Sequence, residues 1–251
     1  MVYITGDTHG DYTRFSTDRF SAQKEMSYQD TMIILGDFGL WHDSPEERYW
    51  LDWLNDKPFT TVWIDGNYEN FNRLYSNEFA ECDFHGGRAH QIRPHIFHLK
   101  RGYIYEFDGK SFFAFGGAKS HDIEDGILYR EDFESEKEFR KTIKKYYEGG
   151  KLFRIAHETW WEQELPSYEE IEFGEKMLAD HGGEVDYVIT HCGPQSVVSF
   201  MGYHGWDLET MFLEEVAHNN LFTHWFFGHY HRDEDIFGKF HCRYERIERI
   251  I

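Results

Sequence analysis

Five short polar blocks, each placed directly after a short apolar run, constrain this chain more than any other feature of its sequence. The apolar runs are rich in β-branched and aromatic residues and are bounded by glycine or polar residues, which is typical of buried strands. In chain order the blocks are Asp7–His9, Gly36–Asp37, Gly66–Asn67, the sequence THCGP around His191, and Gly228–His231. Each block is therefore expected just past the carboxyl end of a strand, which is the edge where ligands bind in open α/β sheets.

The spacing of the first three blocks supports this arrangement. Asp7, Asp37 and Asn67 follow one another at intervals of 30 residues. One strand–helix–strand unit takes about 30 residues. The spacing therefore predicts three consecutive strand ends lying side by side.

The side chains of these blocks predict one dinuclear metal site. They supply three oxygen ligands and four imidazoles, from Asp7, Asp37, Asn67, His9, His191, His229 and His231. This mixture suits two borderline divalent metals, such as manganese, iron, zinc or nickel, better than magnesium or calcium alone. Manganese is the metal we favour.

The composition indicates a folded, cytoplasmic protein. The chain has 251 residues, of which 40% are hydrophobic and 19% aromatic, so disorder is not expected. We expect a single domain over residues 1–251, with residues 119–166 as an insertion or cap within it. There is no apolar run of 18 residues and no signal-peptide pattern, so no membrane contact is expected. Three cysteines without a CxxC pair indicate reduced thiols.

The charge limits the partners of the chain. Its formal net charge is −20, from 26 basic and 46 acidic side chains. An acidic surface repels the phosphates of long DNA or RNA, so such polymers are disfavoured as partners. A small phosphorylated substrate is not excluded, because bound metals can invert the local field. The oligomeric state has no signal in the sequence.

The remaining patterns predict an α/β or α+β fold. Capping residues predict helices that start at Ser44, Ser167 and Asp207. Further helices are expected over residues 69–79 and 131–147. Sequential antiparallel strands are expected over residues 94–99, 103–107 and 111–115, and a closing hairpin over residues 235–247. Strands, helices and then antiparallel strands suggest two packed sheets with helices outside.

The series D-x-H, G-D, G-N, H and G-H-x-H resembles the calcineurin-like metallophosphoesterase superfamily. The motifs span residues 7–231, which is nearly the whole chain. Residues 115–122, Arg130 and residues 160–167 also resemble a branch found in bacterial and phage proteins of unassigned substrate. The resemblance implies a four-layer α/β/β/α sandwich with a two-metal centre in the loops at the strand ends.

The resemblance also implies how the ligands divide between two metals. One metal would take Asp7, His9, Asp37 and His231. The other would share Asp37 and take Asn67, His191 and His229. A hydroxide bridging the metals would attack phosphorus in line with the leaving oxygen, without a covalent intermediate.

Two motifs depart from the family pattern. The second motif usually continues as G-D-x-x-D-R, but this chain has Leu40 and Trp41 at the last two positions. The third motif usually reads G-N-H-[DE], but this chain has Tyr68 in place of the histidine. That histidine often donates a proton to the leaving group in the family. The metal ligands therefore match the family, and the protonation machinery does not.

Three interpretations of these departures remain open. The substrate could carry a good leaving group, as a polyphosphate or nucleotide does. Alternatively Tyr68, His121 or Asp122 donates the proton, while phosphate is bound by one of three arginines: Arg88, Arg101 or Arg130. The third interpretation is a chain that keeps its metals and has lost efficient catalysis.

The sequence thus predicts a metal-dependent phosphoester hydrolase that acts on small phosphomonoesters or nucleotide-type substrates. A phosphodiesterase or nuclease using the same site is one alternative. A metal-bound interaction scaffold with little turnover is another.

Overall fold

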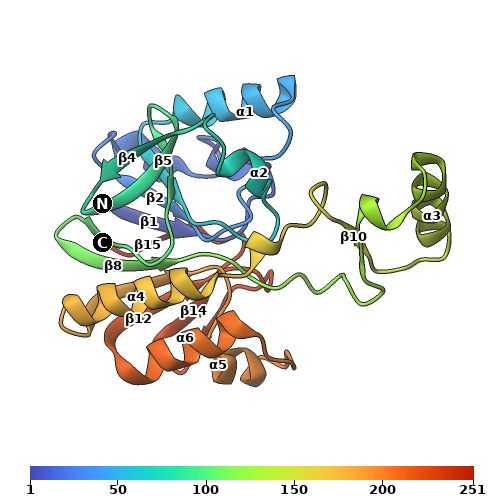
Figure 1. Cartoon of the computed structure of the whole chain (residues 1–251). Helices are drawn as coiled ribbons and strands as arrows, with labels where there is room; N and C mark the ends of the chain where they lie inside the picture. The colour runs from blue at the N-terminus through green and yellow to red at the C-terminus, as the bar shows by residue number, and fades with distance from the viewer.

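Two β-sheets packed face to face form the body of the protein, with helices on both outer faces (Figure 1). This computed structural model describes residues 1–251. The first sheet has seven strands in the order β15-β1-β2-β3-β6-β5-β4. Their bounds are β1 Val2–Thr5, β2 Thr31–Ile34, β3 Thr60–Trp63, β4 Ala80–Phe84, β5 Gly87–Arg93, β6 Ile96–Leu99 and β15 Glu248–Arg249.

The second sheet has six strands in the order β13-β14-β12-β11-β8-β7. Their bounds are β7 Ile104–Phe107, β8 Lys110–Phe115, β11 Glu184–Thr190, β12 Leu221–Phe227, β13 Glu234–Ile236 and β14 Phe240–Cys242. Strand β11 runs parallel to both of its neighbours, β8 and β12. Its carboxyl end therefore opens at the same edge as theirs.

Helices cover the outer face of each sheet (Figure 1). The first sheet carries α1 (Pro45–Asn55) and the short α2 (Phe71–Leu74), and the second carries α4 (Tyr168–Asp180), α5 (Gln195–Phe200) and α6 (Leu208–Asn219). Helices α1, α4 and α6 begin where the capping residues predict, because Ser44, Ser167 and Asp207 each accept a hydrogen bond from a backbone N–H in the first turn. No helix combines the length and the apolar character needed to cross a membrane.

Successive side chains along each strand pack into different layers of the sandwich. In β2, Met32 and Ile34 pack under α1, while Ile33 faces the second sheet. In β11, Val188 faces the outer helices and Ile189 faces the first sheet. Because successive side chains point to opposite faces of a strand, each sheet contributes to one core between the sheets and to one core under its helices. The four-layer α/β/β/α sandwich is therefore confirmed.

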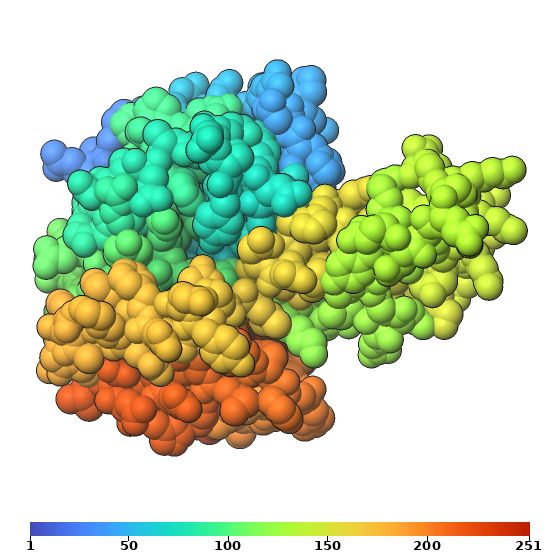
Figure 2. Space-filling view, viewed as in Figure 1, coloured from blue at the N-terminus to red at the C-terminus, as the bar shows by residue number.

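A separate lobe projects from one side of the body (Figures 1 and 2). It contains the two-stranded sheet of β9 (Ile127–Leu128) and β10 (Arg154–Ile155) and the helix α3 (Glu136–Glu148). It has its own small core, formed by Leu128, Phe139 and Ile155. We call residues 121–160 the lobe; they fall within the insertion expected at 119–166.

Several element predictions need correction. The helix expected over residues 69–79 covers only Phe71–Leu74, and a β4–β5 hairpin follows it. The three strands expected to run antiparallel in sequence divide between the sheets, because β6 pairs parallel with β3 in the first sheet while β7 and β8 pair in the second. The closing hairpin is shorter than expected, and β15 returns to pair with β1.

Candidate metal centre

All five polar blocks lie just past the carboxyl ends of parallel strands. Strands β1, β2 and β3 are parallel neighbours, which brings Asp7, Asp37 and Asn67 to one edge of the first sheet. Strands β11 and β12 are parallel neighbours in the second sheet and carry His191 and the Gly228–His231 block. The site is thus assembled from the matching edges of both sheets.

Asp7, His9 and His231 form one group whose ligand atoms all lie within 4.8 Å of one another. The Nε2 atoms of His9 and His231 are 3.0 Å apart. Asp7 Oδ2 lies 3.2 Å from His231 Nε2 and 4.0 Å from His9 Nε2. A carboxylate and two imidazoles therefore point into the same small volume.

Asp37 connects this group to a second one. Its Oδ2 lies 3.8 Å from His9 Nε2, whereas its Oδ1 lies 3.3 Å from His191 Nε2. The Asn67 amide oxygen is also 3.3 Å from His191 Nε2. Asp37 therefore presents one oxygen to each group, which is the arrangement expected of a bridging ligand.

His191 has a defined tautomer. Its Nδ1 lies 2.6 Å from the carbonyl oxygen of Leu35, and a carbonyl can only accept a hydrogen bond, so Nδ1 carries the hydrogen. The lone pair of a neutral ring is then on Nε2, which faces Asp37 and Asn67. A backbone carbonyl bound to the distal nitrogen is a common way of orienting a histidine toward a metal.

Burial also shifts the pKa values of the candidate metal ligands. Burial lowers the pKa of His9 and, to a greater degree, that of His229, so both rings favour the neutral form that binds metals. Burial raises the pKa of Asp37, which outweighs the opposing effect of His191. For Asp7, burial acts in the same direction, but the charge of His191 and the bonds from neighbouring groups leave its pKa lowered.

His229 lies beside the cluster rather than within either group. Its backbone N–H donates to Asp7 Oδ1 at 3.1 Å, and its ring centroid is 5.1 Å from that of His191. The backbone at His9, Asp37, His229 and His231 is left-handed, with φ between 45° and 66°. Such non-glycine conformations cost energy and cluster at functional sites.

These residues fit a metal. Asp7 Oδ2 is completely buried and accepts no hydrogen bond of good geometry, although His231 Nε2 lies 3.2 Å away. A buried carboxylate oxygen so poorly satisfied is costly unless a cation occupies the space beside it. The adjacent glycines allow the close packing. A Cβ at Gly36 would overlap the His191 ring, and a Cβ at Gly66 would overlap the carboxylate of Asp37.

A comparison with known families agrees with this geometry. The family model for calcineurin-like phosphoesterases matches residues 1–233, a span that contains all five blocks. The chain belongs to the calcineurin-like phosphoesterase family. It is therefore a phosphoric ester hydrolase of the metal-dependent kind. No curated protein matched the chain.

The structure explains what occupies the positions where this phosphoesterase departs from its family. Leu40 is fully buried in the core under α1. The Trp41 ring stacks on Tyr68, with centroids 4.5 Å apart and an interplanar angle of 10°. Tyr68 also meets His9 edge-on at 5.4 Å. An aromatic wall thus replaces the acidic and basic side chains that the family pattern places there.

None of the three arginines that the sequence offered as candidates for binding phosphate pairs with a ligand of the cluster. Arg88 lies on β5 and pairs with Glu81 and Asp83 of β4. Arg130 lies on the lobe and pairs with Glu136 and Glu158. Both are already bound to carboxylates of their own neighbourhood.

Arg101 is buried behind the site, where it contacts the segment that carries the third motif. Its guanidinium donates to Asp65, which stands two residues before Asn67, and to the carbonyl oxygen of Gln163 at 2.7 Å. Although burial opposes it, the charge of Arg101 holds the pKa of Asp65 well below its usual range. Arg101 therefore stabilises the segment that carries the third motif, and its buried guanidinium is not accessible to a substrate.

One arginine that the fold brings to the rim of the site is Arg154, which lies in no motif of the sequence. Its guanidinium carbon lies 5.4 Å from the centroid of the Tyr68 ring. Its Nε donates to Asp122 Oδ1 at 2.8 Å. The neighbouring His121 has its ring centroid 6.0 Å from that of His229. His121 and Asp122 therefore lie on the rim of the site, where the sequence placed them as proton-donor candidates.

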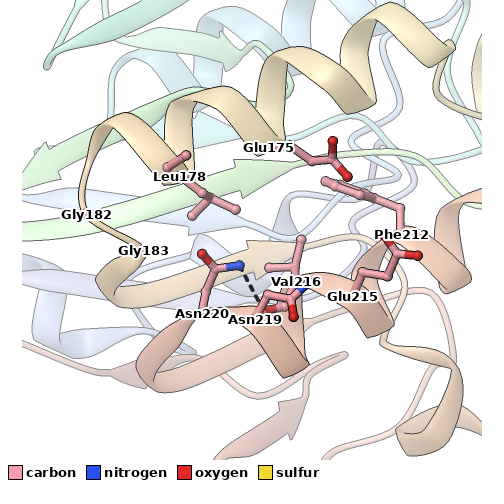
Figure 3. A pocket seen from close by; sticks show the side chains of 10 residues that line it. Glu175, Leu178, Gly182, Gly183, Phe212, Glu215, Val216, Asn219 and Asn220 are labelled. Atoms are coloured by element: carbon pink, nitrogen blue, oxygen red, sulfur yellow. Dashed lines mark hydrogen bonds between the residues drawn. The ribbon is translucent and has the colours of Figure 1, made fainter.

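Three cavities adjoin the cluster. One of about 270 Å³ is lined by His9 and Trp41, one of about 300 Å³ by Tyr68 and Arg154, and one of about 490 Å³ by His121 and His229. A further cavity of about 490 Å³ lies between α4 and α6 (Figure 3). It is at the edge where β11 and β12 begin, and no predicted site residue lines it.

Proposed function

We propose that the centre holds two divalent metals and hydrolyses small phosphorylated molecules, either phosphomonoesters or nucleotide-type substrates. Asp7, His9, Asp37 and His231 would hold one metal. Asp37, Asn67, His191 and His229 would hold the other. The observation that carries the proposal is the convergence of two ligand groups that share the fully buried Asp7, one with His9 and His231 and the other with Asp37 and His191. Asp37 presents one carboxylate oxygen to His9 and the other to His191.

Manganese is the proposed metal, with iron, zinc or nickel as alternatives. The donor set mixes carboxylate and amide oxygens with imidazoles. Borderline divalent ions accept that mixture, whereas magnesium and calcium prefer oxygen ligands alone. Two such ions in a phosphoesterase lower the pKa of water and neutralise charge on the phosphoryl oxygens.

Backbone and side-chain groups of the protein would orient both the metal ligands and the substrate. The Leu35 carbonyl fixes the tautomer of His191. The backbone N–H of Tyr68 donates to Asp37 Oδ1 at 2.8 Å, which fixes the carboxylate that faces both groups. The stacked Trp41 and Tyr68 rings form an aromatic wall beside His9.

The size and charge of the surroundings favour a small substrate. The adjoining cavities have volumes of about 270–490 Å³, which lie just below or in the lower part of the range of about 300–1,000 Å³ for small-molecule sites. The net charge of −20 disfavours a nucleic-acid polymer. A short diester remains the alternative substrate to test.

The first experiment is hydrolysis of p-nitrophenyl phosphate and bis-(p-nitrophenyl) phosphate by metal-stripped protein before and after manganese is added, alongside bound metal content. We expect turnover that depends on manganese, a stoichiometry of two metals per chain, and faster cleavage of the monoester. Asp37→Asn should abolish turnover, since this side chain faces both groups.

His218→Gln is the matched control, because His218 is exposed on α6 far from the cluster. It should behave as the wild type. Faster cleavage of the bis ester would replace the monoesterase by a phosphodiesterase. Two bound metals without turnover on a broad phosphate panel would contradict the proposed hydrolase and favour a metal-bound scaffold.

A further inference from the structure

The cavity of about 300 Å³ beside the candidate metal centre is built jointly by the lobe and by the third motif loop. Tyr68 contributes the wall nearest the cluster. The lobe contributes Asp122, Tyr147, Lys151 and Arg154. A group bound in this cavity would therefore contact both the lobe and Tyr68, the residue that follows the candidate ligand Asn67.

Arg154 is fixed in a definite orientation within this cavity. Its Nε donates to Asp122 and its Nη1 donates to the carbonyl oxygen of Thr159 at 2.9 Å. Its Nη2 makes no hydrogen bond within the chain. The side chain is 12% exposed. A partly desolvated guanidinium with one free nitrogen is a suitable donor for an anion, and a phosphate oxygen fits it well.

A second cation stands near the mouth of the same cavity. Lys151 lies on its wall, with its ammonium 2.6 Å from Asp125 and half of its side chain exposed. Tyr68, Tyr147 and Phe153 add apolar surface to the lining, which also includes the Asp122 carboxylate that pairs with Arg154. The cavity is therefore suited to an anionic group attached to a larger substrate.

The residues missing from the second and third motifs limit which bond can be cleaved here. Position 68 carries a tyrosine stacked on Trp41, and position 40 carries a buried leucine. Neither side chain is the acid of the family pattern. An alkoxide that receives no proton leaves slowly, whereas a phosphate leaves as a stable anion. Negative charge develops on the leaving oxygen as the bond breaks. A positively charged group of the protein would stabilise it.

We infer that Arg154 binds the leaving phosphate of a phosphoanhydride substrate in the cavity between Tyr68 and the lobe. This inference rests on the proposed function and specifies its substrate class. The oxygen of water forms a bond to the terminal phosphorus. The bond from that phosphorus to the bridging oxygen breaks, and its electron pair stays on that oxygen. One water is consumed, two phosphate groups separate, and one proton is released to solvent.

The test compares inorganic pyrophosphate with p-nitrophenyl phosphate and glycerol 2-phosphate, using the manganese-loaded full chain. The three leaving groups are a phosphate, an activated phenolate and an alkoxide. We expect pyrophosphate and p-nitrophenyl phosphate to be cleaved and glycerol 2-phosphate to be a poor substrate. Only pyrophosphate offers a leaving phosphate to Arg154.

Substitution of the arginine separates this role from a general one. Arg154→Ala should lower kcat/KM for pyrophosphate on the order of 10²-fold, the usual loss for one donor to a developing anion, and should lower the ratio of kcat/KM for pyrophosphate to that for p-nitrophenyl phosphate. Arg154→Lys should give an intermediate loss. Arg140→Ala is the control, because Arg140 is an exposed arginine of the same lobe that pairs only with Glu136.

A binding measurement does not depend on turnover. By calorimetry, the wild type should bind methylenediphosphonate more tightly than methylphosphonate, and Arg154→Ala should lose that preference while Arg140→Ala keeps it. The metal content of the protein is measured again after each titration, since a bisphosphonate can remove metal.

These experiments distinguish a failure of the Arg154 inference from a failure of the proposed phosphoesterase function. Cleavage of p-nitrophenyl phosphate without cleavage of pyrophosphate, and without preference for the bisphosphonate, would overturn the inference and leave the phosphoesterase intact. A parallel loss on both substrates in Arg154→Ala would also overturn it. If no substrate is cleaved, the proposed function fails, and the calorimetric preference alone decides whether Arg154 binds a second phosphate.

Discussion

Ser120 donates a hydrogen bond to Glu164, with 2.6 Å between the hydroxyl oxygen and Oε2 of the carboxylate. The same hydroxyl accepts a hydrogen bond from Nδ2 of Asn67 at 3.2 Å. Ser120, Glu164 and Asn67 are all buried. Because Nδ2 is bound to Ser120, the amide oxygen of Asn67 points the other way, toward Nε2 of His191. A carboxylate from the end of the insertion thus orients a candidate metal ligand 97 residues away in sequence.

Removing the serine hydroxyl should therefore weaken metal binding. In Ser120→Ala the amide of Asn67 loses the partner that distinguishes its oxygen from its nitrogen. Loss of such outer contacts typically lowers metal affinity about 10–100-fold. We expect a loss of this size in the weaker of two manganese affinities, measured by calorimetry without substrate. Ser196→Ala, on the exposed surface of α5, is the control. Equal affinities in the two variants would show that the contact does not orient the ligand.

Metal removal should lower the melting temperature. Asp7 and Asp37 are buried carboxylates in one group with His191, and their mutual repulsion is relieved by a cation. A ligand present at 100 times its dissociation constant stabilises the folded state by about 2.7 kcal/mol. Chelation should therefore lower the melting temperature by several degrees, and added manganese should restore it. The shift should be much smaller in Asp37→Asn. An unchanged melting temperature in the wild type would argue against a preformed metal site.

The layered fold could be predicted because its signals are local. The runs before Asp7, Asp37 and Asn67 mark buried strands, and the 30-residue spacing places those strands side by side. The β4–β5 hairpin could not be predicted, because β4 is an edge strand made mostly of exposed or half-exposed residues and has no apolar alternation. Helix α2 is shorter than its pattern suggests because the Ser76 hydroxyl donates to the carbonyl oxygen of Arg73 and helps to end it.

Only part of the candidate site could likewise be predicted from the sequence. Its metal-ligand candidates lie in motifs that follow strands, so their convergence follows from the topology. Arg154, Ser120 and Glu164 all lie in the insertion, and their contacts with the motif loops depend on how this segment folds back. No sequence pattern records a contact between Arg154 and Tyr68. For the same reason the sequence could not show that Arg88, Arg101 and Arg130 have carboxylate partners elsewhere.

Stability should decrease below neutral pH because of a buried pair of histidines. His90 Nδ1 lies 3.1 Å from His98 Nδ1, and His98 Nε2 lies 3.1 Å from Asp65. Burial, reinforced by the charge of His98, lowers the pKa of His90 to about 4. The folded state then binds fewer protons than the unfolded state between about pH 4 and about pH 6.5. The contribution is complete above about pH 6.5 and is lost as the pH falls toward 4.

Urea denaturation at pH 7 and pH 5 measures this loss. The free energy of unfolding of the wild type should fall by about 1–2 kcal/mol more than that of His90→Gln between these two pH values. His218→Gln changes an exposed histidine and should follow the wild type. The same pH dependence in the wild type and in His90→Gln would contradict the role of the buried pair.

The lobe should unfold without the body when its core is damaged. Phe139 is 1% exposed and packs with Leu128 and Ile155 in a cluster separate from those of the sandwich. Phe139→Ala should cost about 3 kcal/mol, a large share of the stability of so small a unit. Amide hydrogen exchange should accelerate across residues 121–160 and stay slow in β2 and β11. A uniform acceleration over the whole chain would show that the lobe and body unfold together.

Restoring the family histidine should widen the substrate range. Tyr68→His places an imidazole beside His9, where Tyr68 now stacks on Trp41. General acid catalysis typically contributes about 10²–10⁴-fold. We expect the lower end of that range on glycerol 2-phosphate, because the buried Leu40 cannot orient the ring as an aspartate would. Hydrolysis of p-nitrophenyl phosphate should change little, since its leaving group needs no proton. If Tyr68 is itself the proton donor, Tyr68→Phe will lower activity on glycerol 2-phosphate and Tyr68→His will give no gain, so the two variants together decide whether this site has lost its acid or replaced it.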